Sequence, residues 1–266
     1  MNMKDTKESK EFNIPGENFL GENLCRIFDC NIWLDAGEKN LLAGPDAAAK
    51  KYNPSAGVYS TALSYTKSPE AANEYLTREN QKNPGRHFAY AAAPLMRGAD
   101  ICEIIDSLIN ENAACIRLFP KKSNYSLSGG ETERLLSAME NRRLPLMIWH
   151  TETTWGEIDK ICGRHPELPV IVDGNDKKLL YHNRAYIPLL LKHPNLYLET
   201  FNLIQYMAYE TLVNKYEIDR FVFGTNYPSN SPLAPLYMLL LSDIPEETKE
   251  KILNGNMKNL IANIKK

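Results

Sequence analysis

The chain alternates short apolar runs with longer stretches in which apolar residues recur at helical spacing. Eight of the runs have the length of buried strands, and we predict strands at 26–29, 57–63, 87–91, 114–119, 144–149, 169–173, 196–200 and 220–224. Between them the apolar positions follow an i, i+3, i+4 pattern, which predicts helices at 100–110, 130–141 and 155–163 among others. Strands and helices therefore succeed one another from about residue 24.

This alternation predicts an α/β fold whose parallel strands are joined by helical crossovers. Eight repeats that close on themselves form a (β/α)8 barrel, and an open doubly wound sheet is the rival arrangement. No glycine-rich turn of the G-x-G-x-x-G or P-loop type follows the first predicted strand. We therefore predict one barrel domain over residues 24–266.

Two segments fall outside the pattern. Residues 1–23 read as a polar N-terminal tail, and residues 36–56, rich in Ala, Gly, Pro and Lys, form a long insertion after the first strand. Loops that follow barrel strands lie on the active face. The insertion is therefore either a lid over a site or a surface loop without a role.

Charge and hydropathy exclude several classes of partner. The 266 residues carry a formal net charge of -2, without the basic excess of a nucleic-acid-binding protein. The longest apolar runs, such as 236–241, are far shorter than the roughly 18 residues of a membrane span. Residues 1–12 lack the apolar region of a signal peptide, which predicts a cytoplasmic protein. The five cysteines form no C-x-x-C pair, so we expect reduced, mostly buried thiols.

In a (β/α)8 barrel the functional residues lie at the carboxyl ends of the strands. These ends contain polar and aromatic side chains that we predict to bind a small-molecule ligand: Asp29, Asn31, Trp33, Arg117, Trp149, Asn175, Asn226 and Tyr227. The aromatic members either form the wall of a pocket or simply fill the barrel mouth.

The segment Asp219-Arg-Phe-Val-Phe-Gly-Thr-Asn-Tyr-Pro228, followed by Ile252-Leu-Asn-Gly-Asn256, resembles the end of the amidohydrolase-related barrels. This is the group that contains aminocarboxymuconate semialdehyde decarboxylase, and its usual ending is D-R-hydrophobic-hydrophobic-F-G-S-D-Y-P and then I-L-x-x-N. Residues 144–150, 164–173 and 191–199 are similar to the family's segments around strands five, six and seven. The resemblance covers residues 24–262 and implies a metal-dependent hydrolase or decarboxylase.

The resemblance also implies a centre for zinc or another divalent metal. The family's ligands are two His after strand one, one His each after strands five and six, and an Asp after strand eight. The matching positions here are Asn31, Trp33, Gly174 and Asn226, and at strand five His150 competes with Trp149 for the ligand position. Four or five of the five ligands are therefore absent. Because catalytic zinc takes about three protein ligands, we predict a degenerate metal site and no cofactor.

Other chemistry at the same mouth needs no metal. A Cys30–His150 nucleophile is one option, but strand alternation turns Cys30 away from Asp29 and Asn31, toward a helix. His150, Asp173 and Glu199 form a second option as acid–base catalysts. Alternatively, Asp29 and Asp173 accept hydrogen bonds from the backbone or from Arg117 and only neutralise the mouth.

The remaining histidines read as structural. His165 and His193 precede strands, and His87 opens the third strand, so all three lie at the opposite end of the barrel. His182 lies in a polar helical stretch and is predicted to be solvated.

Three functions follow from these observations. The first is a barrel protein that binds a small molecule or a partner without metal-dependent hydrolysis. The second is an active hydrolase that works metal-free or through a rearranged site. The third is a non-catalytic interaction partner of an active paralogue. A homodimer is a family-level expectation, and whether the protein is an enzyme is left open.

Overall fold

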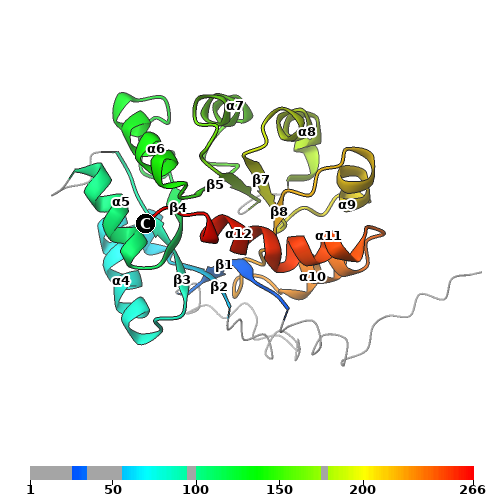
Figure 1. The fold of residues 1–266 in the computed structure, drawn as a ribbon, viewed down its shortest axis with the longest axis horizontal. Helices are drawn as coiled ribbons and strands as arrows, with labels where there is room; N and C mark the ends of the chain where they lie inside the picture. The colour runs from blue at the N-terminus through cyan, green and yellow to red at the C-terminus, as the bar shows by residue number, and fades with distance from the viewer. Residues whose placement is uncertain (1–25, 35–55, 95–99, 175–178) are drawn as a thin grey trace, which may run out of the picture.

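The computed structural model describes residues 26–34, 56–94, 100–174 and 179–266. Eight parallel strands lie side by side in chain order (Figure 1). They are β1 (Asp29–Trp33), β2 (Gly57–Ser60), β3 (His87–Ala91), β4 (Ala113–Leu118), β5 (Leu146–Trp149), β6 (Val170–Asp173), β7 (Leu196–Glu199) and β8 (Phe221–Val222). The predicted N-terminal tail and nearly all of the predicted lid insertion lie outside the described residues.

Helices follow most of the strands and surround the sheet (Figure 1). They are α3 (Leu63–Thr66), α4 (Pro69–Lys82), α5 (Ile101–Asn110), α6 (Gly130–Arg142), α7 (Trp155–Arg164), α8 (Asn183–Lys192), α9 (Ala208–Glu210), α10 (Leu233–Leu240), α11 (Glu246–Glu250) and α12 (Asn256–Ala262). A 3-10 turn covers Leu179–His182, and π-helical turns cover Thr211–Lys215 and Lys251–Gly255.

The sheet closes on itself through backbone contacts between its first and last strands. The amide of Cys30 donates to the carbonyl oxygen of Phe223 at 2.8 Å, and the amide of Trp33 donates to that of Tyr227 at 2.8 Å. Ile32 and Tyr227 also form a parallel bridge. These bonds join the β8 segment to β1 and confirm the predicted (β/α)8 barrel.

The three helices predicted by range are confirmed as α5, α6 and α7. N-terminal capping explains where two of these helices begin. Asp100 accepts the amide of Cys102 at the start of α5, and Thr154 forms a capping box with Glu157 at the start of α7.

The predicted bounds of the first strand are wrong. The apolar run 26–29 precedes the strand, and the ladder to β2 pairs Asp29 with Gly57 and Trp33 with Ser60. Strand one therefore extends through Asn31 and Trp33, which were expected beyond its end. The second strand is also shorter than predicted, because Leu63 already begins α3.

The barrel interior is apolar in its lower half. One cluster of packed side chains takes a residue from every strand: Cys30, Val58, Ala89, Cys115, Met147, Ile171, Tyr197 and Val222. Met257 and Leu260 of α12 join this cluster, and α12 lies across one end of the barrel (Figure 1). Ile261 lines a cavity together with His87, the first residue of β3, so α12 covers the amino ends of the strands.

The prediction that strand alternation turns Cys30 to the face opposite Asn31 is wrong for a geometric reason. The pairing of β1 with β2 shifts register between Asp29 and Ile32, as in a β-bulge. The bulge allows both Cys30 and Asn31 to face the interior. Burial raises the pKa of the Cys30 thiol well above its usual value, so the thiol is a poor nucleophile.

In the described residues, no helix combines the length and the apolar character needed to cross a lipid bilayer.

Candidate functional site

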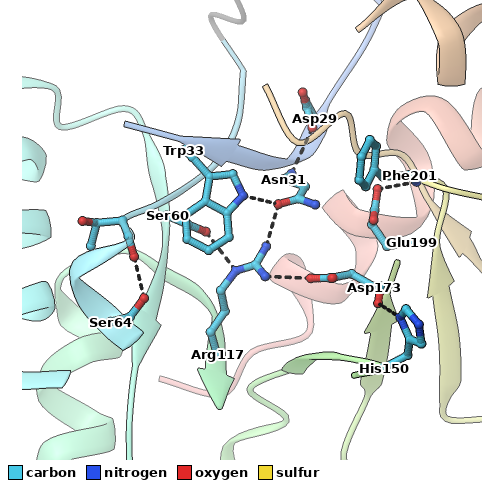
Figure 2. Close-up of polar contacts among 11 residues, drawn as sticks. Asp29, Asn31, Trp33, Ser60, Ser64, Arg117, His150, Asp173, Glu199 and Phe201 are labelled. Atoms are coloured by element: carbon cyan, nitrogen blue, oxygen red, sulfur yellow. Dashed lines mark hydrogen bonds and ion pairs between the residues drawn. The ribbon is translucent and has the colours of Figure 1, made fainter. Parts of the chain in front are cut away.

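The upper half of the barrel interior contains a fully buried arginine. Arg117 of β4 is two residues after Cys115 and therefore points to the same side, but one layer nearer the carboxyl ends of the strands. Its guanidinium donates to Asp173 Oδ2 at 2.7 Å, to Asn31 Oδ1 at 2.9 Å and to Ser60 Oγ at 2.9 Å (Figure 2). Arg117 is 1% exposed and Asp173 is fully buried. Arg117 and its three partners, Asp173, Asn31 and Ser60, are called the Arg117 network below.

Asn31 and Trp33 connect strand one to this network. The indole N–H of Trp33 donates to Asn31 Oδ1 at 2.8 Å, and the guanidinium carbon of Arg117 lies 4.9 Å from the centre of the Trp33 ring. Because Asn31 Oδ1 accepts from two donors, the amide orientation is settled and Nδ2 points the other way. Among the described residues, Asn31 Nδ2 has no hydrogen-bond partner.

Asp29 belongs to the seam between β1 and β8 rather than to the Arg117 network. Its carboxylate accepts the amide of Asn31 at 2.9 Å and the hydroxyl of Thr225 at 2.5 Å. The geometry agrees with the alternative in which Asp29 and Asp173 accept hydrogen bonds from the backbone and from Arg117.

Glu199 at the end of β7 is a fully buried carboxyl group. Its Oε1 accepts the amide of Phe201 at 2.7 Å, whereas Oε2 has no partner among the described residues. Burial raises the pKa of Glu199 well above its usual value, and the negative charges of Asp173 and Asp29 raise it further. The group is therefore a neutral carboxylic acid over part of the pH range in which a glutamate is normally ionised.

Gly224 makes room for this carboxyl group. A Cβ placed on Gly224 would overlap with the Glu199 carboxyl oxygen Oε1, and would lie 2.7 Å from Glu199 Cδ and 2.9 Å from Asn31 Cβ. A side chain at residue 224 is thus incompatible with the position of Glu199, and the glycine brings Glu199 and Asn31 close together.

His150 follows β5 and contacts the backbone of Asp173. Its Nδ1 lies 3.3 Å from the backbone carbonyl oxygen of Asp173 (Figure 2). The carboxylate of Asp173 is held by Arg117 instead. The structure therefore brings His150, Asp173 and Glu199 to one end of the barrel, and their catalytic role stays a prediction.

The prediction that His182 is solvated is wrong. Its Nδ1 accepts the indole N–H of Trp155 at 3.0 Å, and its ring lies 5.3 Å from that of His150 in an edge-on arrangement. The polar sequence around His182 gave no sign of this, because the contacts come from Trp155 and His150, which are distant in sequence.

An aromatic cluster fills part of the mouth above the Arg117 network. Trp33, Phe119 and Trp149 are buried against one another, with Tyr65 at the edge. Trp149 has the same inward direction as Met147, so it takes the inward position at the end of β5, and His150 comes after it. The ammonium group of Lys122 lies 5.1 Å from the Tyr65 ring centre and 5.5 Å from that of Trp149.

Of the other predicted ligand-binding residues, Asn226 and Tyr227 follow β8 as expected. Asn226 is buried and has a positive φ of 56°. Tyr227 contributes its backbone to the closure of the barrel. Asn175 lies outside the described residues.

The residues at the family's ligand positions do not fit a divalent cation. Asn31 Oδ1 already accepts hydrogen bonds from the positively charged guanidinium of Arg117 and from the indole of Trp33. The indole nitrogen of Trp33 is itself a donor only and cannot act as a metal ligand. Within the described ranges, no three His, Cys, Asp or Glu residues are grouped so as to hold a metal ion.

Sequence reasoning missed Ser60 and Thr225, which bind Arg117 and Asp29. Ser60 is the last residue of β2, and its position at the carboxyl end of a strand was a signal that could have identified it. Glu152 was also missed, and its carboxylate accepts the backbone amides of Lys121 and Lys122 at the rim.

Three solved structures with similar folds were compared with this chain. 2,6-Dihydroxybenzoate decarboxylase from Rhizobium has a TM-score of 0.60 at 14% identity, over 89% of this chain and 98% of that one. Amidohydrolase 2 from Bifidobacterium longum subsp. infantis has a TM-score of 0.60 at 20% identity, with the same coverage. A manganese-bound 5-carboxyvanillate decarboxylase from Novosphingobium aromaticivorans has a TM-score of 0.61 at 14% identity, over 77% and 76%. Identities this low show the fold alone.

A search of curated proteins finds no significant match. The amidohydrolase-2 family model, described as "Amidohydrolase", matches residues 35–258, which is most of the chain. The match agrees with the resemblance at residues 219–228 and 252–256. The chain therefore belongs to the amidohydrolase family.

Proposed function

We propose that this protein is an amidohydrolase-family barrel in which the Arg117 network replaces the metal centre, and that it binds a small molecule at the barrel mouth without metal-dependent hydrolysis. The observation that carries the proposal is the buried guanidinium of Arg117, bonded at once to the strand-one amide Asn31 and the strand-six carboxylate Asp173.

Electrostatics supports the substitution of one cation for another. A divalent ion beside Arg117 would experience repulsion in a region from which water is excluded, and such repulsion is poorly screened. Arg117 neutralises the buried Asp173 permanently and needs no free metal in solution.

The relatives suggest where a ligand search should begin. Two of the similar structures are named as decarboxylases of 2,6-dihydroxybenzoate and 5-carboxyvanillate. The aromatic cluster at this mouth suits a planar ring. We therefore include substituted benzoates and their uncharged amides in the first binding panel.

Metal analysis of protein purified without chelators tests the proposal. We expect substoichiometric zinc, manganese and iron by mass spectrometry, and no change in melting temperature when these ions are added. At least one member of the ligand panel should raise the melting temperature of metal-free protein. A stoichiometric metal that survives dialysis would refute the proposal.

A metal-free enzyme is the second candidate, and Glu199 is the observation that favours it. A carboxyl group with a raised pKa can serve as a general acid near neutral pH. An assay of lactones, esters, amides and benzoates should compare the native protein with His150→Ala and Glu199→Gln. Turnover that both variants lose would favour the enzyme, and turnover that neither variant loses would exclude these residues as its catalysts.

The cytoplasmic location and the homodimer remain predictions. Sedimentation analysis of the purified chain tests the second one directly.

A further inference from the structure

A second polar feature lies beside the Arg117 network, between β1 and β7. Asn31 and Glu199 approach one another over the bare Cα of Gly224, and both side chains are fully buried. Figure 2 shows the amide nitrogen of Asn31 on the side that faces Glu199. Each side chain has one polar atom without a partner among the described residues, namely Asn31 Nδ2 and Glu199 Oε2.

The hydrogen-bond role of each atom follows from the bonds made by the other polar atom of the same side chain. Asn31 Oδ1 accepts from Trp33 and Arg117, so Nδ2 carries two N–H groups that point away from them. Glu199 Oε1 accepts the amide of Phe201, so the proton of the neutral acid is on Oε2. Both free positions are therefore donors.

The surroundings of Glu199 keep this proton in place. Burial is the main cause of its raised pKa. The titratable and charged groups facing it come from three strands and one helix: Asp29 and Cys30 on β1, Arg117 on β4, Asp173 on β6 and Tyr209 on α9. The hydrogen bond from the backbone amide of Phe201 and the charge of Arg117 act in the opposite direction and favour the ionised form.

Two buried donors that do not bond to each other need an acceptor between them. A buried donor without a partner carries a desolvation penalty of about 1–3 kcal/mol, and native proteins leave few such groups unexplained. One acceptor oxygen placed between Asn31 Nδ2 and Glu199 Oε2 would satisfy both groups.

Charge decides which oxygen suits the position. Among the described residues, the interior around it contains two carboxylates, Asp29 and Asp173, and one guanidinium, that of Arg117. A further anion would be repelled there, whereas an uncharged oxygen would not. The arrangement favours a carbonyl oxygen over a carboxylate or phosphate.

We propose that Asn31 Nδ2 and Glu199 Oε2 form a two-donor site that binds the carbonyl oxygen of an uncharged ligand, an amide or an ester. This inference rests on the proposed function, because it assigns the ligand class of the same metal-free mouth. The pair is called the donor pair below. Two donors aimed at one carbonyl oxygen polarise it, as backbone amides do in an oxyanion hole.

The test uses acetamide as the probe and acetate as its charged counterpart, with chelator-treated full-length protein. A crystal structure with acetamide should place the probe's oxygen within about 3.2 Å of both donors, and acetate should be absent from this position. Acetamide bound elsewhere, or a lone water between the donors at saturating acetamide, would overturn the proposal.

Variants provide an independent measurement by NMR titration of acetamide. Glu199→Gln keeps a neutral donor at the Oε2 position, so the dissociation constant should change by less than about threefold. Asn31→Asp replaces the donor with an acceptor and should weaken binding by about tenfold, the equivalent of one hydrogen bond. Glu152→Gln, the same change at a buried rim glutamate, should leave it unchanged.

The outcomes separate this proposal from the one on which it rests. Loss of binding in Glu199→Gln equal to that in Asn31→Asp would show that Glu199 accepts rather than donates, and would refute the donor pair alone. If Asn31→Asp does not fold, the crystal structure decides. Stoichiometric metal in the untreated sample would refute the metal-free mouth, whatever acetamide does.

Discussion

The two polar regions at the top of the barrel interior differ in how completely their hydrogen bonds are made. In the Arg117 network the guanidinium has three partners on three other strands, Asn31, Ser60 and Asp173. In the donor pair, two equally buried atoms, Asn31 Nδ2 and Glu199 Oε2, have none among the described residues. From this contrast we infer that the first region stabilises the fold, and we propose that the second binds a ligand.

Asn31 belongs to both regions and shows how they are coupled. Its oxygen is held by Arg117 and Trp33, and this fixes the direction of its free N–H groups. The hydrogen bonds of the Arg117 network therefore orient the donor pair, as supporting hydrogen bonds orient functional side chains in other sites.

The largest expected effect is on the Arg117 network. Arg117→Met leaves the buried carboxylate of Asp173 without its counter-charge, and we expect the free energy of unfolding to fall by about 3–5 kcal/mol. Urea denaturation measures this change. Arg134→Met is the matched control, because Arg134 is 59% exposed in its ion pair with Asp100, and it should change stability by at most about 0.5 kcal/mol. Equal stability of the two variants would contradict the role of the network.

A side chain at residue 224 should disturb the donor pair. The new Cβ of Gly224→Ala would displace the Glu199 carboxyl group, and we expect a loss of about 1–3 kcal/mol in the free energy of unfolding. Gly156→Ala, on the exposed face of α7 with open space around the new methyl group, should instead stabilise by about 0.5–1 kcal/mol. Thermal unfolding of both variants checks the opposite signs, and a neutral Gly224→Ala would refute the close approach.

The pH dependence of stability tests the protonation of Glu199. Its pKa is raised on folding, so between its usual pKa, near 4.5, and the raised value the folded state binds more protons than the unfolded state. Stability from this group is therefore fully present at low pH and is lost as pH rises through that window, at up to about 1.4 kcal/mol per pH unit.

Glu199→Gln removes this titration. The stability of the native protein relative to the variant should decline from pH 5 upward, as measured by urea denaturation at a series of pH values. If the free energies of unfolding of the two proteins changed in parallel with pH, Glu199 would titrate normally. That result would refute the proposal that Glu199 is a neutral donor.

The smallest effect is expected at the rim. Lys122→Met removes the cation over Tyr65 and Trp149 and should destabilise the protein by about 0.5–1 kcal/mol. Lys160→Met, at an exposed position on α7, is the control. If the difference in melting temperature between Lys122→Met and the native protein disappears at high salt, the effect of Lys122 is due to its charge alone.

Hydrophobic periodicity was sufficient to predict the barrel and the positions of α5, α6 and α7, because these elements bury continuous apolar faces. It misplaced β1, since the bulge between Asp29 and Ile32 depends on pairing with β2 and β8 and leaves no trace in the local pattern. The contacts of His182 with Trp155 and His150 were missed for the same reason, because they join segments distant in sequence.

The candidate site was partly predictable. Position at strand ends was enough to select Asn31, Arg117, Asp173 and Glu199, because a barrel brings these ends together. The sequence did not show that Arg117 donates hydrogen bonds to both Asp173 and Asn31. It also did not show that Gly224 makes room for the carboxyl group of Glu199 beside Asn31. Those facts depend on side-chain directions that only the folded barrel determines.

The central claim is that Arg117 takes the place of the metal, and anomalous X-ray diffraction tests it most directly. Crystals grown with zinc or manganese should show no anomalous peak at the barrel mouth, with the guanidinium of Arg117 still bonded to Asp173. A peak about 2.0–2.3 Å from a side-chain atom of Asn31, His150 or Asn226, with Arg117 displaced, would contradict the account.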